Sequence, residues 1–80
     1  MIYVYLLPSR RFPAMRYVGS TRNLNRRVEE HNSGKSPHTA RGAPWDVIVA
    51  VRFAELERGI AFERYLKSGS GHAFAKRHLW

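Results

Sequence analysis

RYVGSTRNLNRRVEEHNSG, residues 16–34, joins a strand pattern directly to a helix pattern, and this junction decides the fold. Residues 16–20 contain the aromatic and β-branched side chains that favour a short strand. From Asn23 the pattern becomes helical, because Asn23 can cap a helix and apolar side chains recur after it at helical spacing. The segment 32–34 is a stop signal. We therefore expect a strand over 16–20 and a helix over 23–32.

A second strand pattern precedes this stretch. Residues 2–7 are apolar, β-branched and aromatic, which is typical of a buried strand, and Pro8-Ser9 ends the pattern. The segment that follows has the length of a hairpin loop, so we expect the two strands to pair antiparallel. Tyr3, Tyr5 and Tyr17 would then share one small sheet.

The second half of the chain predicts a third strand and two further helices. Residues 45–53 are mostly apolar, which indicates a strand at the centre of the sheet. Helical spacing returns over 56–68, the serines and glycines of 68–71 break it, and 73–80 can form a last short helix. The sequence therefore predicts an α/β (α+β) fold in a single domain, with a small three-stranded antiparallel or mixed sheet flanked by helices.

The charge balance points to a polyanionic partner. Lys and Arg number 14 against 6 Asp and Glu, a net charge of +8, and nucleic acid is the first candidate because phosphate contacts supply affinity without sequence readout. The absence of cysteine excludes disulfides, thiolate zinc sites and thiol nucleophiles. We find no signal peptide, membrane span or lipidation signal, so we expect a cytoplasmic protein with no membrane partner.

Arg27 and His31 are four residues apart, so on a helix they lie on one side, close to the strand that contains Tyr17. Considered alone, the pair is better interpreted as part of a solvated basic face than as a site. The order of the elements changes this interpretation.

The chain resembles the GIY-YIG nuclease superfamily. The resemblance rests on Tyr3-Val4-Tyr5 in the first strand, Tyr17-Val18-Gly19 in the second and Arg27 ten residues past Tyr17. It extends through HNSGKSPHTARGAPWDVI and FERYLKSGSG, which look like the small single-domain branch, with a likeness to the incision domains of excision repair. It covers nearly the whole chain and implies a GIY-YIG endonuclease-like fold.

The resemblance also implies roles for five residues. Tyr5 and Tyr17 match the two motif tyrosines, and Arg27 matches the catalytic arginine. His31 falls where the family carries histidine or tyrosine, and Glu63 falls where it carries the metal-binding glutamate. Tyr5 is our first choice as general base, with His31 either the base itself or the group that takes the proton from Tyr5. We expect all five side chains to line one concave surface.

The family reaction is hydrolysis of a phosphodiester bond with one divalent cation, leaving a 5′-phosphate and a 3′-hydroxyl. Arg27 can fork onto the non-bridging oxygens, and a single carboxylate, Glu63, suffices for Mg²⁺ (or Mn²⁺), which keeps most of its waters. We expect a weakly specific DNA endonuclease in DNA repair or processing, with single-stranded or branched DNA, and RNA, as further substrates. The residues expected to contact nucleic acid are Ser20, Arg26, Lys35, Thr39, Arg41 and Lys67.

Two other functions are compatible with the sequence. A non-catalytic nucleic-acid-binding module would have the same fold and the same charge. An adaptor for an acidic protein would also use the charge, but it leaves the positions of the tyrosines, Arg27, His31 and Glu63 unexplained.

Overall fold

The computed structural model describes all residues, 1–80, and contains both strands and helices. In chain order the elements are β1 (Ile2–Pro8), β2 (Arg16–Thr21), α1 (Leu24–Asn32), the 3-10 helix η1 (Ala40–Gly42), β3 (Val49–Phe53), α2 (Leu56–Leu66) and α3 (Gly69–His78). The α+β fold with a three-stranded antiparallel sheet is the one expected from the sequence.

The sheet has the order β2-β1-β3, with β1 antiparallel to both neighbours. The prediction of a hairpin between β1 and β2 is therefore confirmed, whereas the prediction that the third strand is central is wrong. That strand begins only at Val49 and its side chains alternate between half-buried and exposed, as on an edge strand. Val47 and Ile48 are apolar but about half exposed, so a run of apolar residues did not identify the central strand.

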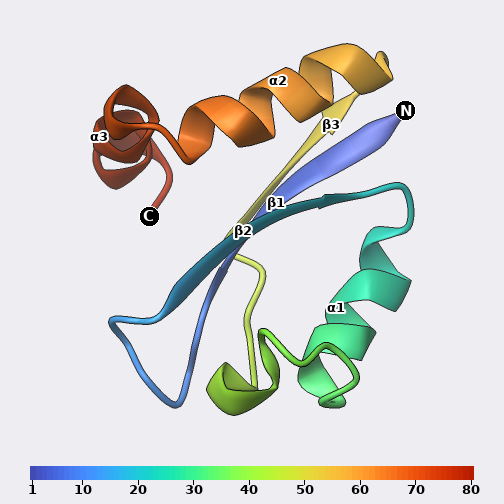
Figure 1. The fold of residues 1–80 in the computed structure, drawn as a ribbon, viewed down its shortest axis with the longest axis vertical. Helices are drawn as coiled ribbons and strands as arrows, with labels where there is room; N and C mark the ends of the chain where they lie inside the picture. Colours follow the sequence, from blue (N-terminus) through green and yellow to red (C-terminus); the bar gives the residue numbers. More distant parts are fainter.

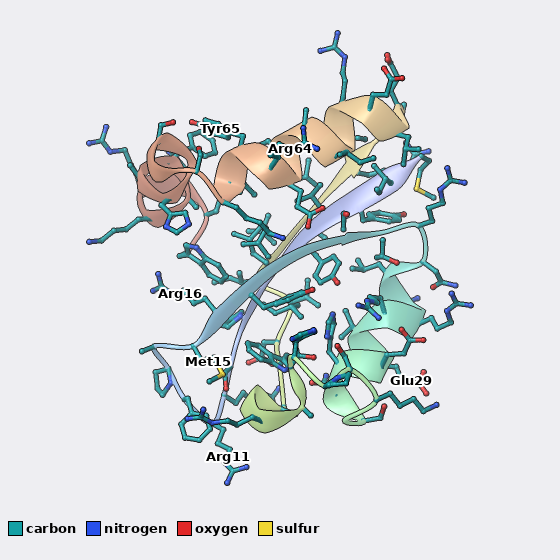
Figure 2. All side chains as sticks on the ribbon, viewed as in Figure 1. Arg11, Met15, Arg16, Glu29, Arg64 and Tyr65 are labelled. Carbon is teal, nitrogen blue, oxygen red and sulfur yellow. The ribbon has the colours of Figure 1, made fainter.

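Each face of the sheet carries its own layer of helices (Figure 1). Because side chains alternate along a strand, Val4 and Leu6 pack with α2 and α3, whereas Tyr5 and Leu7 point to the opposite face. There they pack with Leu24 and Val28 of α1, the inward pair of that helix, and with the loop that follows it. Figure 2 shows side chains of both layers filling the space on either side of the ribbon of the sheet.

The last helix starts earlier than predicted. The segment 68–71 does break the second helix, but Ser68 accepts a hydrogen bond from the backbone N–H of Gly71 and so caps α3, which begins at Gly69. Gly71 lies so close to the end of α2 that a Cβ atom would collide with the carbonyl of Tyr65. A glycine that signals a break in the sequence therefore permits two helices to pack closely.

The loop between α1 and β3 is anchored by Trp45, which is buried. Its indole N–H donates to the carbonyl of Thr39 at 2.8 Å, and its backbone N–H donates to the side chain of Asn32. These contacts hold the loop against the end of α1. None of the helices is both long enough and apolar enough to cross a lipid bilayer.

Candidate active site

Tyr5 lies on the central strand directly opposite Gly19 of the edge strand β2. Its ring crosses Gly19 so closely that a Cβ atom there would lie 2.6 Å from the Tyr5 hydroxyl and 2.7 Å from the ring of Tyr17. Gly19 is thus required by this close approach, because any side chain would displace one tyrosine or the other. The tyrosine hydroxyl is thereby carried to the outer edge of the sheet.

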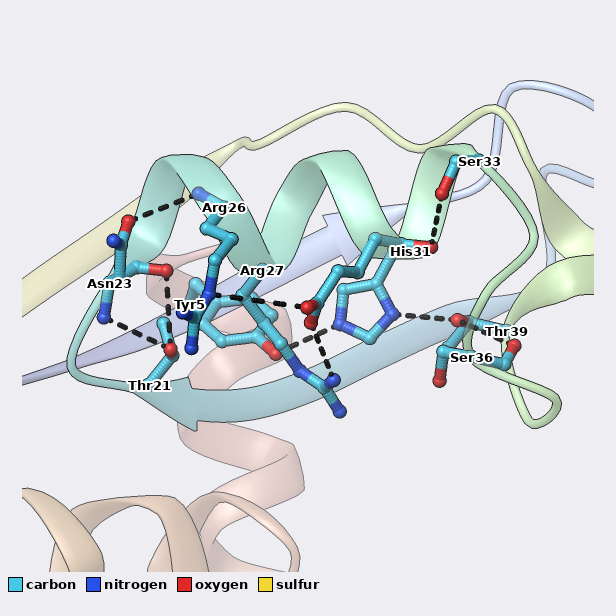
Figure 3. Close-up of polar contacts among 10 residues, drawn as sticks. Tyr5, Thr21, Asn23, Arg26, Arg27, His31, Ser33, Ser36 and Thr39 are labelled. Atoms are coloured by element: carbon cyan, nitrogen blue, oxygen red, sulfur yellow. Dashed lines mark hydrogen bonds and ion pairs between the residues drawn. The ribbon is translucent and has the colours of Figure 1, made fainter.

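His31 connects Tyr5 to the loop after α1. Its Nε2 atom lies 2.9 Å from the Tyr5 hydroxyl and its Nδ1 atom lies 2.6 Å from the hydroxyl of Thr39 (Figure 3). Tyr5, His31 and Thr39 are 1%, 0% and 1% exposed, so solvent does not compete for these hydrogen bonds. Burial, together with the charge of Arg27, lowers the pKa of His31, so the ring is neutral at pH 7.

Tyr17 completes an aromatic cluster around His31. Its ring centroid lies 4.9 Å from that of His31 and 6.2 Å from that of Tyr5. Unlike Tyr5, Tyr17 is only half-buried. Its phenol is therefore accessible to a substrate, while the Tyr5 ring lies behind it.

Arg27 lies one helical turn before His31, on the same side of α1. Its Nη1 atom donates to Oε1 of Glu30 at 3.0 Å, and its side chain remains 37% exposed. The guanidinium also lies beside the Tyr5 hydroxyl, where its charge favours the ionised phenol. Burial raises the pKa of Tyr5 to about 12, and Arg27 offsets part of that rise.

Glu63 reaches the same edge strand from the other layer. Its Oε1 atom accepts from the Ser20 hydroxyl at 2.5 Å, and its Oε2 atom lies 2.9 Å from Nζ of Lys67. Burial alone would raise the pKa of Glu63, but these two hydrogen bonds outweigh it and lower the pKa below its usual value. Glu63 is also near enough to Tyr5 to raise the pKa of that phenol.

The structure thus brings together Tyr5, Tyr17, Arg27 and His31 on one face of the sheet. Glu63 lies across β2 from these four, because Ser20 and Gly19 are consecutive and point to opposite faces. The five residues therefore surround an edge strand instead of lining one face. No three His, Cys, Asp or Glu side chains converge as they would in a multi-ligand metal site. One ionised carboxylate fits a Mg²⁺ ion that keeps most of its waters and also binds phosphate.

Three of the residues expected to contact phosphate bind other side chains of the protein instead. Thr39 is buried against His31, which contradicts the expectation that its hydroxyl contacts nucleic acid. Ser20 donates to Glu63 instead, and Lys67 is paired with the same carboxylate. Arg26, Lys35 and Arg41 are exposed and can meet a phosphate backbone, although Arg26 also lies 4.0 Å from the Glu30 carboxylate.

Sequence reasoning missed Glu30 and expected Thr39 to contact nucleic acid, not His31. Glu30 fixes the Arg27 side chain, and their spacing of three positions on a helix is a signal that could have revealed the pair. The contact between Thr39 and His31 had no such signal, because a loop of irregular structure determines it.

Residues 1–77 match the family described as the GIY-YIG catalytic domain. No curated protein and no solved structure matches the chain significantly. The matched region contains every strand and helix that supplies the site, apart from the end of α3. The chain belongs to the GIY-YIG catalytic domain family, a membership that implies a nuclease domain acting on phosphodiester bonds.

Proposed function

We propose that the protein is a metal-dependent endonuclease that hydrolyses phosphodiester bonds in DNA and leaves a 5′-phosphate and a 3′-hydroxyl. The observation that carries the proposal is the buried hydrogen bond between Tyr5 and His31, which lies behind the exposed Arg27 and the accessible Tyr17. A proton acceptor and an anion-binding group are thus adjacent, as hydrolysis of a phosphodiester requires.

Tyr5 acts as the general base, and His31 accepts the proton that Tyr5 gives up. A phenol whose pKa is about 12 gives up its proton too reluctantly to act alone at neutral pH. The neutral imidazole of His31, 2.9 Å away, takes that proton while the Tyr5 oxygen takes one from the attacking water. In this proposal Tyr5 and His31 each take part in one proton transfer.

Arg27 binds the phosphate. Its guanidinium has five N–H donors in a planar fork, and the contact with Glu30 engages only Nη1. The remaining exposed donors can bind two phosphoryl oxygens. The Tyr17 hydroxyl can donate a hydrogen bond to the same phosphoryl group. Both contacts strengthen as negative charge develops on the phosphoryl oxygens in the transition state.

Glu63 is the residue that would hold the divalent cation, Mg²⁺ or Mn²⁺. When bound, the cation supplies Lewis-acid stabilisation of phosphate charge. Ser20 fixes the orientation of the carboxylate by a hydrogen bond. The ammonium group of Lys67 lies beside the carboxylate and supplies a positive charge there. Lys67 is half exposed, so it can turn away toward the nucleic-acid backbone.

The substrate is selected by charge and shape. A net charge of +8 favours any nucleic-acid backbone, and the exposed Arg26, Lys35 and Arg41 extend the basic surface around the site. This supports a weakly sequence-specific enzyme of DNA repair or processing that also accepts single-stranded or branched DNA, with RNA as a further candidate.

The test is a cleavage assay on end-labelled single-stranded, duplex and branched DNA, and on RNA, with Mg²⁺, with Mn²⁺ and with EDTA. We expect cation-dependent cleavage, with product 5′-ends that a phosphatase converts to hydroxyls. Salt-sensitive binding without any product would establish the alternative, a non-catalytic nucleic-acid-binding module of the same fold.

A further inference from the structure

We propose that Thr39 is a positioning residue that fixes the tautomer of His31, so that Nδ1 carries the proton and Nε2 is left to accept one from Tyr5. This inference rests on the proposed function. A neutral imidazole has one donor nitrogen and one acceptor nitrogen, and only the form with an unprotonated Nε2 can take the Tyr5 proton.

The direction of the hydrogen bonds follows from the end of the chain at Thr39. The Thr39 hydroxyl lies 3.4 Å from the carbonyl of Ser36, which can only accept. With its proton directed to this carbonyl, the Thr39 oxygen accepts from Nδ1–H of His31, 2.6 Å away. Nε2 is then left to accept from the Tyr5 hydroxyl, so the chain runs from Tyr5 through His31 and Thr39 to Ser36.

The burial of His31 and Thr39 keeps this direction fixed. His31 is 0% and Thr39 is 1% exposed, so water cannot supply either side chain with an alternative partner for a reversed chain. The backbone of Thr39 is itself held, because its carbonyl accepts from the indole of Trp45 and its N–H donates to Ser36. Thr39 is therefore a fixed acceptor for Nδ1–H.

The proton transfers balance with this arrangement. The attacking water gives a proton to the Tyr5 oxygen as the phenolic proton passes to Nε2 of His31, and the imidazolium formed still donates from Nδ1 to Thr39. The new bond joins water oxygen to phosphorus, and the bond to the 3′-oxygen breaks. That oxygen takes a proton from solvent, into which His31 later releases its own.

Nitrogen NMR of the ¹⁵N-histidine-labelled protein tests the tautomer without any substrate. We expect the His31 signals of the Nδ1–H form at pH 7.5 in the wild type and in Thr39→Ser, and a shift toward the other tautomer in the nearly isosteric Thr39→Val. We also expect kcat to fall at least about tenfold in Thr39→Val, with KM unchanged, and to be largely restored in Thr39→Ser.

Protonation of wild-type His31 on Nε2 would overturn the inference even if Thr39→Val lost activity. A wild type with the expected tautomer that cuts no nucleic acid would instead refute the proposed nuclease function and leave the role of Thr39 in place. Full activity of Thr39→Val would also overturn the inference.

A second inference comes from a hollow on the opposite layer. We infer that the cavity of about 260 Å³ between β2 and α3 binds a backbone phosphate of the nucleic acid that the site acts on. Four of its seven lining residues are apolar, and the other three carry basic side chains: Arg16, His72 and Lys76. This inference rests on the proposed function, because it assumes that a nucleic acid bound at the candidate active site extends to the cavity.

The charges around this cavity favour an anion. No Asp or Glu side chain lines it, and neither Arg16 nor Lys76 forms an ion pair, whereas five other basic residues of the chain do. The Arg16 guanidinium lies 4.9 Å from the ring centroid of Trp80, which also lines the cavity and holds this charge beside it. Figure 2 labels Arg16 at the start of β2, on the α3 side of the molecule.

The cavity is close to the candidate active site. Val18, which lines it, and Ser20, which binds Glu63, are two positions apart and point to the same face of β2. Two residues of a strand span roughly 7 Å. A nucleic acid at Glu63 therefore needs only a short length of backbone to reach the cavity.

Binding of a fluorescent single-stranded oligonucleotide in EDTA, measured over a range of salt concentrations, tests this site. We expect Arg16→Gln/Lys76→Gln to weaken binding about tenfold and to reduce the slope of log Kd against log salt by about 1, the loss of one phosphate contact. The charge-matched control Arg52→Gln/Arg58→Gln, on β3 and α2, should change both much less.

Equal losses in the two double variants would contradict the phosphate site, because the effect would then be one of net charge alone. Lys76→Gln is tested separately, since it leaves the contact between Arg16 and Trp80 intact. A wild type that binds no oligonucleotide would refute the proposed function itself.

Discussion

The hydroxyl of Tyr5 and Nε2 of His31 lie 2.9 Å apart, although the two residues are 26 positions apart in the chain. Tyr5 comes from the central strand and His31 from the last turn of α1, so the contact depends on the packing of that helix on the sheet. The geometry places the Tyr5 phenol, a weak acid, against the neutral imidazole of His31, which can accept its proton. The pair is therefore expected to behave as one unit in catalysis.

Tyr5→Phe and His31→Phe should each lower kcat at least about 100-fold, because each interrupts the same proton transfer. The double variant should be little worse than either single variant, since residues that act as a unit are not additive. Single-turnover cleavage rates give the comparison. Multiplicative losses would mean that the two residues act in separate steps.

Activity should depend on pH through His31, which must be neutral to accept a proton. Its pKa lies below 6.5, since burial and Arg27 lower it while Glu30 partly opposes them, so kcat/KM should be flat above about pH 6.5 and fall in more acidic solution. A rate that instead rises tenfold per pH unit between 7 and 9 would show that ionisation of another group controls the reaction.

The same pKa predicts the pH dependence of stability. Below about pH 6.5 the unfolded chain protonates His31, whereas the folded protein resists protonation until a lower pH. The unfolded state therefore binds more protons in this range, and the free energy of unfolding falls as the pH drops. Urea denaturation at several pH values measures it, and His31→Phe should reduce this dependence.

Gly19→Ala should disrupt the site, because a Cβ atom would lie 2.6 Å from the Tyr5 hydroxyl and 2.7 Å from the Tyr17 ring. We expect a loss of about 1–3 kcal/mol in the free energy of unfolding and a large loss of activity. Gly69→Ala is the matched control, since nothing lies within 4 Å of a Cβ there. Similar melting temperatures for the two variants would argue against the tight packing around Gly19.

Glu63→Gln should abolish cation-dependent cleavage and leave nucleic-acid binding in EDTA intact, because the amide keeps the shape of the side chain but loses its charge. Mn²⁺ binding, measured by titration calorimetry or electron paramagnetic resonance, should weaken in parallel. Glu57→Gln, on the exposed side of the same helix, is the control. Unchanged Mn²⁺ affinity in Glu63→Gln would assign the cation to another residue.

Local sequence patterns predicted the elements better than their arrangement. The strand and helix of residues 16–34 could be predicted because the cap at Asn23 and the stop after Asn32 are local signals, and the structure has both. The position of residues 49–53 at the sheet edge could not, because apolar content does not reveal which strand acquires two neighbours. The start of α3 could not be predicted either, because the serines and glycines of 68–71 indicate a break, whereas Ser68 caps a helix there.

The candidate site shows a similar division. Arg27 and His31 are one turn apart in the sequence, and the structure keeps them on one side of α1 (Figure 3). The burial of Thr39 and the position of Glu63 across β2 depend on tertiary packing, which no spacing in the sequence encodes. The identity of a residue thus suggested its chemistry, whereas its neighbours determined what it can contact.

The rate of phosphodiester cleavage by Arg27→Ala, relative to the wild type, tests the central claim most directly. Arg27 is partly exposed, so its loss should leave the melting temperature nearly unchanged, and Arg58→Ala provides a control on another helix. We predict Mg²⁺-dependent cleavage by the wild type and by Arg58→Ala, and a rate at least about 100-fold lower for Arg27→Ala. Equal cleavage by all three proteins would contradict the account, because the activity would then not arise from this site.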